Sequence, residues 1–240
     1  MNFELIVESL PVLWKGALLT LQLFAITMVV STLLAVPLAI GRVQKEWWLR
    51  WPIELFSQVF RGTPLLVQIF IVYYGVAQID AVRDSWAWPY LRKPYWCAAI
   101  TFVLNTTAYA IHIFRGAIQA VPHGEVEAGH AFGLSFSALY RHIILPRATL
   151  LALPAYGNEV IKTIKRTSLA SAITLPELTG VANTLVARTF APYEIFIAAG
   201  LIYLAFAFAA NHVIRWLEHR MSRHLRHLSP AKLDPDLMLT

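Results

Sequence analysis

The stretch EVEAGHAFGLSFSALYRHIILP, from Glu125 to Pro146, differs in character from the sequence on either side of it. It mixes acids, histidines, a glycine and a closing proline, whereas its neighbours are apolar enough for the interior of a lipid bilayer. Pro122 and Gly124 interrupt the helix that comes before it. Glu125 and Glu127 follow in the first turn of a new helix, where acidic side chains are favoured. The sequence therefore predicts a polar helical segment between two apolar spans.

A glycine divides this polar segment into two expected short helices. The first helix would run to Phe132, and Gly133 can supply the left-handed residue that ends it. Ser135 or Ser137 can cap a second helix that runs through Arg141, and the closing proline then opens the next span. The two helices form either a compact plug on one face of the membrane or a surface hairpin that only links two spans. The physics of the segment alone leaves both open.

The composition of the whole chain predicts a membrane protein. Of its 240 residues, 58% are hydrophobic and 14% are charged, and the mean hydropathy is +0.56; a soluble domain is usually less apolar and more charged. Cys97 is the single cysteine, and no Cys and His cluster has metal-ligand spacing, so no metal is expected. The formal charge of +6 comes from basic residues between apolar segments. They predict topology signals rather than a nucleic-acid partner.

Five segments are apolar over roughly the 20 residues that a membrane-spanning helix needs. They cover about residues 11–41, 57–78, 94–116, 148–168 and 191–214. The fourth is the least regular, because its second half contains Glu159, Lys162, Lys165 and Arg166. We expect one all-α transmembrane domain over residues 1–240, with a cytoplasmic loop at 119–147 and a cytoplasmic tail at 215–240.

The basic residues also predict the orientation of the spans, since positively charged flanks stay in the cytoplasm. Most Lys and Arg residues fall on one side if the N-terminus lies outside the cell, and many of these are in the tail HRMSRHLRHLSPAK. The polar segment and the C-terminus are then cytoplasmic. The first residues, MNFELIVES, carry acids where a secretory signal needs positive charge, so no cleaved peptide is expected.

The polar segment also carries a motif. The pattern E-A-x-x-x-x-G, nine further residues and I-x-L-P is met by Glu127, Ala128, Gly133, Ile143, Leu145 and Pro146. It resembles the EAA loop of permease subunits of bacterial ATP-binding-cassette (ABC) importers, where that loop docks into a groove on the ATPase subunit. Gly129 replaces the second Ala of the motif, a change between small residues that we expect to matter little. With Glu125, these residues are the expected coupling site.

Further segments are similar to the polar amino acid branch of these importers. They are Gly16 with Thr20 and Leu21, FRGTPLLVQIFIVYYG (60–75), YAIHIFRGAI (109–118), VPHGEVEA (121–128), LPAYGNEVI (153–161), and KRTSL followed by PEL. Together they cover nearly all of residues 16–180. The likeness is strongest to the M-type permease subunit of histidine, arginine/ornithine and octopine or nopaline systems, and it specifies the transporter class more closely than the substrate.

The resemblance implies a type I importer (MetI-like) permease fold with five spans in the bacterial inner membrane, the N-terminus in the periplasm. It implies four kinds of partner: a related Q-type permease subunit that forms a pseudo-symmetric heterodimer, two ATPase subunits, a periplasmic amino-acid-binding protein and the surrounding lipid. The chain has no GxxxxGK[ST] loop, so ATP and Mg²⁺ belong to the ATPase partners and no cofactor or catalytic residue is expected here.

The expected function is import of a basic amino acid (histidine, arginine, ornithine or lysine) or an opine. The alternatives are a permease for glutamate, glutamine or another polar amino acid, an ion channel, and a membrane enzyme. A channel needs a filter or pore ring, and an enzyme needs a nucleophile and base, or metal ligands, at one depth. His123, His130 and His142 lie instead within or beside the coupling loop.

Ionisable groups at membrane depth are candidates for substrate contact, because they are costly there. Glu159, Lys162 and Arg166 are three and four residues apart and share one helix face. They either satisfy one another as ion pairs, with Lys162 the nearest partner of Glu159, or lie close enough to the headgroups to snorkel. Alternatively, Glu159 and Asn158, with Lys162 as a further candidate, line a cavity in which Glu159 attracts the cationic end of an amino acid. Arg166 stands where the family usually has Asp, in KDTSL.

Other polar residues in the spans have structural interpretations as well. His112 stands where the family more often has Glu, in YxxEIxRG, and it either packs in the core or lines the same cavity. Asn105, Thr106 and Thr107 are expected to make hydrogen bonds between helices. Arg61, in the FRGTP sequence, is expected to shape the cytoplasmic entry to the second span.

Overall fold

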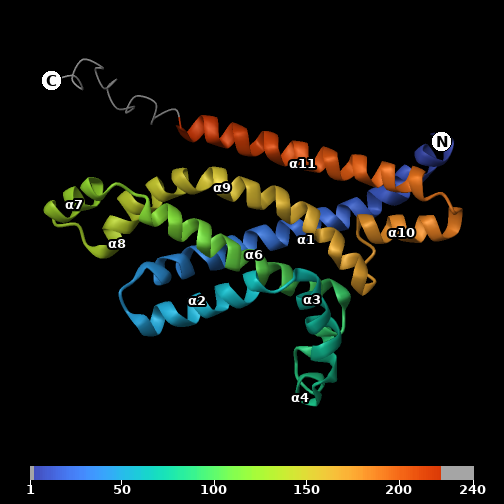
Figure 1. Ribbon diagram of the computed structural model, residues 1–240, viewed down its shortest axis with the longest axis horizontal. Helices are drawn as coiled ribbons and strands as arrows, with labels where there is room; N and C mark the ends of the chain where they lie inside the picture. The colour runs from blue at the N-terminus through green and yellow to red at the C-terminus, as the bar shows by residue number, and fades with distance from the viewer. Residues whose placement is uncertain (1–2, 223–240) are drawn as a thin grey trace, which may run out of the picture.

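The computed structural model describes residues 3–222, and every regular element in this range is a helix (Figure 1). Three helices are each long and apolar enough to cross a bilayer: α1 (Phe3–Val43), α6 (Pro94–Gln119) and α11 (Pro192–Ser222). Together with α9 (Leu145–Arg166) they run side by side along the long axis of the molecule (Figure 1). The expected all-helical membrane fold is confirmed.

Two further candidate spans are bent. α2 (Trp47–Gly62) is followed by α3 (Leu65–Phe70), a π turn (Ile71–Gly75) and a 3-10 turn (Val76–Gln78), and the two parts meet at 103°. The second bent pair joins the helical run 136–173 to α10 (Leu178–Thr189) at 50°. If each bent pair is one span, the described residues contain up to five, which agrees with the expected number.

The first bend follows from the sequence Gly62–Thr63–Pro64. Proline has no N–H to continue a helix, and it disfavours the helical backbone for the residue before it. Thr63 accordingly has φ −111° and ψ 145°, which is extended backbone. The segment expected as the second span, 57–78, therefore contains the end of α2, the bend and α3 rather than one straight helix.

Small side chains let α1 approach its neighbours closely, as is usual between helices in membranes. Gly16 lies against α10, where an added Cβ would be 2.8 Å from Cγ2 of Val181. Further along α1, Ala35 is fully buried and packs with Ala110 and Ile111 of α6. This close contact makes α1 the common support of α6 and α10.

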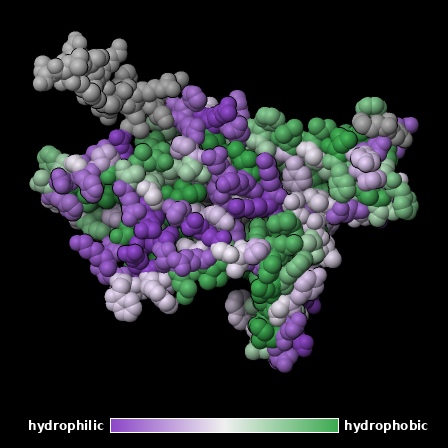
Figure 2. Space-filling model, in the orientation of Figure 1, coloured by the Kyte–Doolittle hydropathy of each residue, from purple (hydrophilic) through white to green (hydrophobic). Residues whose placement is uncertain are grey.

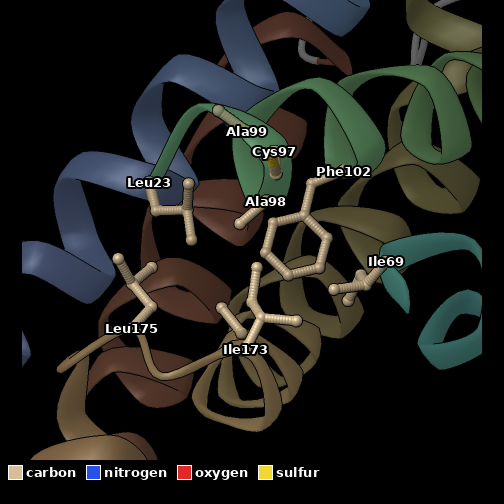
Figure 3. Close-up of a cluster of buried hydrophobic side chains, with 9 residues drawn as sticks. Leu23, Ile69, Cys97, Ala98, Ala99, Phe102, Ile173 and Leu175 are labelled. Carbon is tan, nitrogen blue, oxygen red and sulfur yellow. The ribbon is translucent and has the colours of Figure 1, made fainter. Parts of the chain in front are cut away.

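Apolar side chains fill the space where the two bent spans meet α1 and α6 (Figure 3). Leu23 comes from α1, Ile69 from α3 and Phe102 from α6, while Ile173 and Leu175 lie where the helical run before α10 ends. All five are buried. Thr174, between the last two, has a left-handed backbone with φ 65°. The packing of this core therefore holds both bends in place.

The remaining helices lie outside this bundle of long helices. α4 (Asp80–Arg83) and α5 (Trp88–Leu91) belong to an arm that projects from one side of the molecule (Figure 1). α7 (His123–Ala131) and α8 (Phe136–Leu139) lie at the end of the long axis opposite the N-terminus and α10 (Figure 1). The loop expected in the cytoplasm and the N-terminus expected outside are thus at opposite ends.

Candidate functional site

α7 is the first of the two short helices expected in the polar segment. Pro122 precedes its first residue with extended backbone, and Phe132 follows its last. Gly133 has φ +71°, so the expected left-handed residue is confirmed. The oxygen Oγ of Ser135 then accepts a hydrogen bond from the Ala138 N–H at 3.4 Å and caps α8, one of the two serines expected to do so.

The second short helix does not end at Arg141. α8 continues through a π turn (Tyr140–Ile144) into α9 and the 3-10 turn (Thr167–Ile173), so one helical run extends from the polar segment to Ile173. Pro146 lies in the first turn of α9, where the missing proline N–H is tolerated, and the wide turn before it resets the hydrogen-bond register. The expected break between loop and span is therefore wrong.

α7 is attached to this helical run on one face and exposed on the other. Its Gly129 is buried, and an added Cβ would lie 2.5 Å from Cδ1 of Leu139 and 2.8 Å from Cδ1 of Ile143. The Ala that is usual in the motif would force both side chains to move, so the small-for-small change affects packing directly. Glu127 and Ala128 are exposed on the outer face of the segment.

An ion pair adds to this attachment. Nη2 of Arg147, in the first turn of α9, lies 3.1 Å from Oε1 of Glu125 in α7. Of the other expected coupling residues, Ile143 is half-buried against Gly129 of α7, Leu145 is half-buried, and Pro146 is exposed. A displacement of α7 would thus be passed to α9 through packing and through one ion pair.

The second candidate site lies further along the same helical run. The Glu159 side chain is buried, with 3% of its surface exposed. Its Oε1 accepts a hydrogen bond from Nη1 of Arg166 at 2.6 Å. Among the described residues the ion-pair partner of Glu159 is Arg166, two turns along the helix, and not Lys162. The longer Arg side chain reaches back along the helix, while Lys162 is exposed.

Three helices meet at Tyr109 of α6. The Arg166 guanidinium carbon lies 4.7 Å from the centre of the Tyr109 ring, and that of Arg61 in α2 lies 5.6 Å from it. Both distances are typical of cation–π contacts. His112, one turn along α6, is exposed, so it is not the packed core residue that was one of its two interpretations. Asn158 is exposed next to Glu159.

Hydrophilic residues gather on the face shown in Figure 2, over the middle and the α7 end of the molecule, while the projecting arm carries a large apolar surface (Figure 2). Asn158, Lys162 and Lys165 follow one another at helical spacing on the exposed side of α9. Charged side chains in a span are costly unless protein or water covers them. This polar face is therefore not a surface for lipid.

The structure adds two polar clusters that sequence reasoning missed. Gln68 of α3 accepts from Nδ2 of Asn105 at 3.1 Å, and its own Nε2 donates to the Phe60 carbonyl at 2.9 Å. This confirms the interhelical role of Asn105, which also donates to the Phe60 carbonyl at 2.9 Å. The signal in the sequence is a lone amide inside the apolar run LLVQIF.

The other cluster surrounds Glu177, which is fully buried before α10. Its carboxylate accepts from the Tyr203 hydroxyl at 2.7 Å, from the Thr20 hydroxyl at 3.2 Å and from the Gly180 N–H at 2.9 Å. Glu177 thus joins α1, α10 and α11. An acid at the start of a helix was a visible signal, since such residues favour caps.

Known proteins share this architecture and sequence. Residues 28–223 match the family described as "Binding-protein-dependent transport system inner membrane component". The octopine transport system permease protein of Rhizobium meliloti is 44% identical over 231 residues, 94% of each chain. The histidine/lysine/arginine/ornithine transport system permease protein of Escherichia coli K12 is 39% identical over 223 residues, 90% of this chain and 94% of that one.

Solved structures agree with the sequence comparison. A crystal structure of an amino acid ABC transporter with histidines superposes with a TM-score of 0.81 at 26% identity, covering 92% of this chain and 99% of that one. A MetNI methionine ABC transporter in an inward-facing conformation superposes with a TM-score of 0.71 at 12% identity, over 93% and 100% of the two chains, which supports the fold alone. The chain belongs to the family of binding-protein-dependent transport system inner membrane components, the permease subunits of ABC transporters.

Proposed function

We propose that this chain is one transmembrane subunit of an ATP-driven importer that carries a basic amino acid or an opine across the bacterial inner membrane. The N-terminus lies in the periplasm and the C-terminus in the cytoplasm. A related Q-type permease subunit, two ATPase subunits and a periplasmic binding protein complete the importer. The chain itself catalyses no reaction, and ATP and Mg²⁺ bind to the ATPase subunits.

The observation that carries this proposal is the polar face of α6 and α9. Asn158 and Lys162 are exposed on α9, and His112 is exposed on α6, which is apolar enough to cross a bilayer. In a bilayer such groups face a protein partner or a water-filled path. A second permease subunit placed against this face would enclose a hydrophilic route between the two chains, as a transporter of polar solutes requires.

The continuous helix from α8 to α9 supports a mechanism for coupling. ATP binding closes the ATPase pair and moves α7, whose exposed side carries Glu127 and Ala128. The contacts of Gly129 with Ile143, and the ion pair of Glu125, pass this motion to the run 136–173. Because the run is unbroken, the end that carries Glu159 moves with it, and the polar face opens to one side of the membrane at a time.

Glu159 and Arg166 provide the chemistry for solute contact. The Glu159 carboxylate attracts a guanidinium or ammonium group, and Arg166 holds its charge when no solute is present. When the cation of the solute replaces Arg166 beside Glu159, the buried carboxylate is never left unpaired. The exchange therefore avoids the cost of an unpaired buried charge. Lys162 and Asn158 then lie at the rim of the contact, on the exposed side of α9.

Reconstitution tests the proposed function. The chain is expressed with its permease and ATPase partners, purified as a complex and placed in liposomes with the binding protein. We expect uptake of labelled arginine, histidine or octopine that requires both ATP and the binding protein. Uptake without ATP would instead indicate a channel, and purification of the chain free of any ATPase would contradict the proposal.

A further inference from the structure

The polar face carries more positive than negative charge. Arg42 forms an ion pair with Glu54, to which its Nε donates at 2.7 Å, and Arg166 forms one with Glu159. No described carboxylate forms an ion pair with Arg61. His112 and the exposed Lys162 add no negative charge. Within residues 3–222, the surroundings of Tyr109 therefore hold a net excess of cations.

Three arginine side chains have a buried donor that no described residue satisfies. They are Nε of Arg61, Nε of Arg115 and Nη1 of Arg42. A buried donor without an acceptor is unfavourable, so native proteins rarely leave one. Within residues 3–222, the Arg61 guanidinium lies against the face of the Tyr109 ring, which offers no oxygen.

Arg61 and Arg166 share Tyr109 as a platform, although they come from α2 and α9. The ring contacts both guanidinium groups, and a planar guanidinium fork matches the two oxygens of a carboxylate. Nη1 of Arg166 already donates to Glu159. Glu159, on the same side of α9 as Arg166, offers the opposite charge a few ångströms away. A cation contact and an anion contact thus stand side by side.

We infer that Arg61 and Arg166 form an anion subsite that binds a carboxylate of the transported solute, and that this subsite selects a solute with more than one carboxylate. This inference rests on the proposed function of the chain as an importer subunit. A plain basic amino acid carries net positive charge and meets an excess of cations here. A guanidino compound with a second carboxylate, such as an opine, has no net positive charge and complements both contacts.

Direct binding to the purified permease–ATPase complex tests this without the selectivity of the binding protein. The two probes are L-arginine and octopine, which is arginine with a carboxyethyl group on its α-nitrogen. We expect the wild-type complex to bind octopine more tightly than arginine. Arg166→Gln should weaken octopine binding by about tenfold, the effect of one lost charge-assisted contact, and change arginine binding less.

Two further variants serve as controls for folding and for the location of the subsite. The double change Glu159→Gln with Arg166→Gln leaves no unpaired charge, so it separates loss of the subsite from loss of folding. Arg188→Gln removes an exposed arginine from α10, away from the polar face, and should leave both affinities unchanged. Equal binding of the two probes by the wild type, or equal weakening of both by Arg166→Gln, would overturn the inference.

Experiments on the same complexes show whether the carboxylate comes from the solute or from the second permease subunit. They also separate failure of the anion subsite from failure of the proposed function. If an acid of the second permease subunit satisfies Arg61, Arg61→Gln will loosen the association of the two permeases without changing the ratio of the two affinities, and the inference is wrong. If the wild-type complex imports arginine with ATP but binds octopine no more tightly than arginine, the anion subsite is wrong and the proposed function stands. Complex that imports neither probe overturns the proposed function.

Discussion

The Glu159 carboxylate is almost removed from solvent, and the Arg166 guanidinium at 2.6 Å supplies its compensating charge. A buried charge is stable only while a partner of opposite charge stays beside it. Arg166 also contacts the Tyr109 ring of α6, with its guanidinium carbon 4.7 Å from the ring centre. Replacement of a single oxygen of this carboxylate should therefore change the uptake kinetics of the transporter.

Replacement of Glu159 by Gln tests its role in solute contact. We expect the complex to assemble and to keep its basal ATPase activity, because Arg166 retains its contact with Tyr109 and is 24% exposed. The solute concentration for half-maximal uptake should rise about tenfold or more, since an ion pair with the solute is lost. Thermal unfolding of the complex serves as the control for stability.

Two results would contradict this role. Unchanged uptake kinetics in a well-assembled Glu159→Gln complex would remove Glu159 from the path of the solute. Failure of the same complex to assemble would mean that the pair with Arg166 is structural, which is the plain alternative for these two residues.

Gly133 is the second residue for which a single substitution is informative. Its backbone has φ +71°, which costs roughly 1–2 kcal/mol for a residue with a Cβ and more for a β-branched one. We expect Gly133→Val to tilt α7 relative to α8 and to weaken binding of the ATPase. Co-purification of the ATPase with the permease measures the effect.

Gly200 offers a matched control, since an added Cβ there meets no atom within 4 Å and its backbone is helical. Gly200→Val should leave ATPase binding intact. Wild-type ATPase binding and transport in Gly133→Val would mean that the turn between α7 and α8 is not required for docking.

At the scale of the elements, α8, the π turn and α9 act as one rod. Its near end packs under α7 through Leu139 and Ile143, and its far end carries Glu159. Proline is present in this rod at Pro146 and Pro154, the first of which lies where its missing N–H costs little. The rigidity of the run from Ile143 to Glu159, which contains both prolines, decides whether motion at one end reaches the other.

Thr149→Pro should break this connection. The N–H of residue 149 continues α9 and a proline there costs about 3 kcal/mol in a helix interior, while the side chain of Thr149 is exposed. We expect ATP hydrolysis to persist but transport per ATP to fall about tenfold or more. Simultaneous measurement of uptake and phosphate release in liposomes gives this ratio.

Thr149→Ala is the control for loss of the threonine side chain, whose hydroxyl donates to the Leu145 carbonyl at 2.7 Å. It keeps the backbone donor and should transport normally. If Thr149→Pro transports as many molecules per ATP as the wild type, the rod is not the coupling element.

At the scale of the whole molecule, the charge pattern and the number of spans predict the same membrane topology. α7 and the N-terminus lie at opposite ends of the long axis (Figure 1), and α11 runs to Ser222 with basic residues in its last turn. An odd number of spans places the two termini on opposite sides of the membrane. The part of the expected tail beyond Ser222 lies outside the described residues.

Cysteine labelling tests this topology. The buried native Cys97 is first replaced by Ala, so that it cannot react with the reagent. A new cysteine is then placed at Ala81 in the arm or at His219 near the end of α11. An impermeant thiol reagent should label the Ala81 position from the periplasm and the His219 position only after the membrane is opened. Labelling of both positions from one side would mean that a bent pair does not cross the membrane.

Local properties of the sequence determined the spans, the turn at Gly133 and the motif of the polar segment. Length and apolar composition predict the spans, because a helix must satisfy its own backbone in lipid and needs a set length to cross it. Gly133 predicts a left-handed turn, since glycine alone has no Cβ to oppose it. The motif around Glu127 and Pro146 resembles that of importer permeases, and this resemblance agrees with the family match.

The tertiary structure alone decided which groups meet. The two cations on Tyr109 and the burial of Glu177 among three helices depend on how helices far apart in the sequence pack. The pairing of Glu159 with Arg166 lies within α9, where the side-chain conformations decide it. Helical spacing places side chains on a face, but it does not say which of two cations reaches the acid or what lies opposite. Small residues such as Gly16 set the distances between helices, and those distances decide which polar groups are close enough to bond.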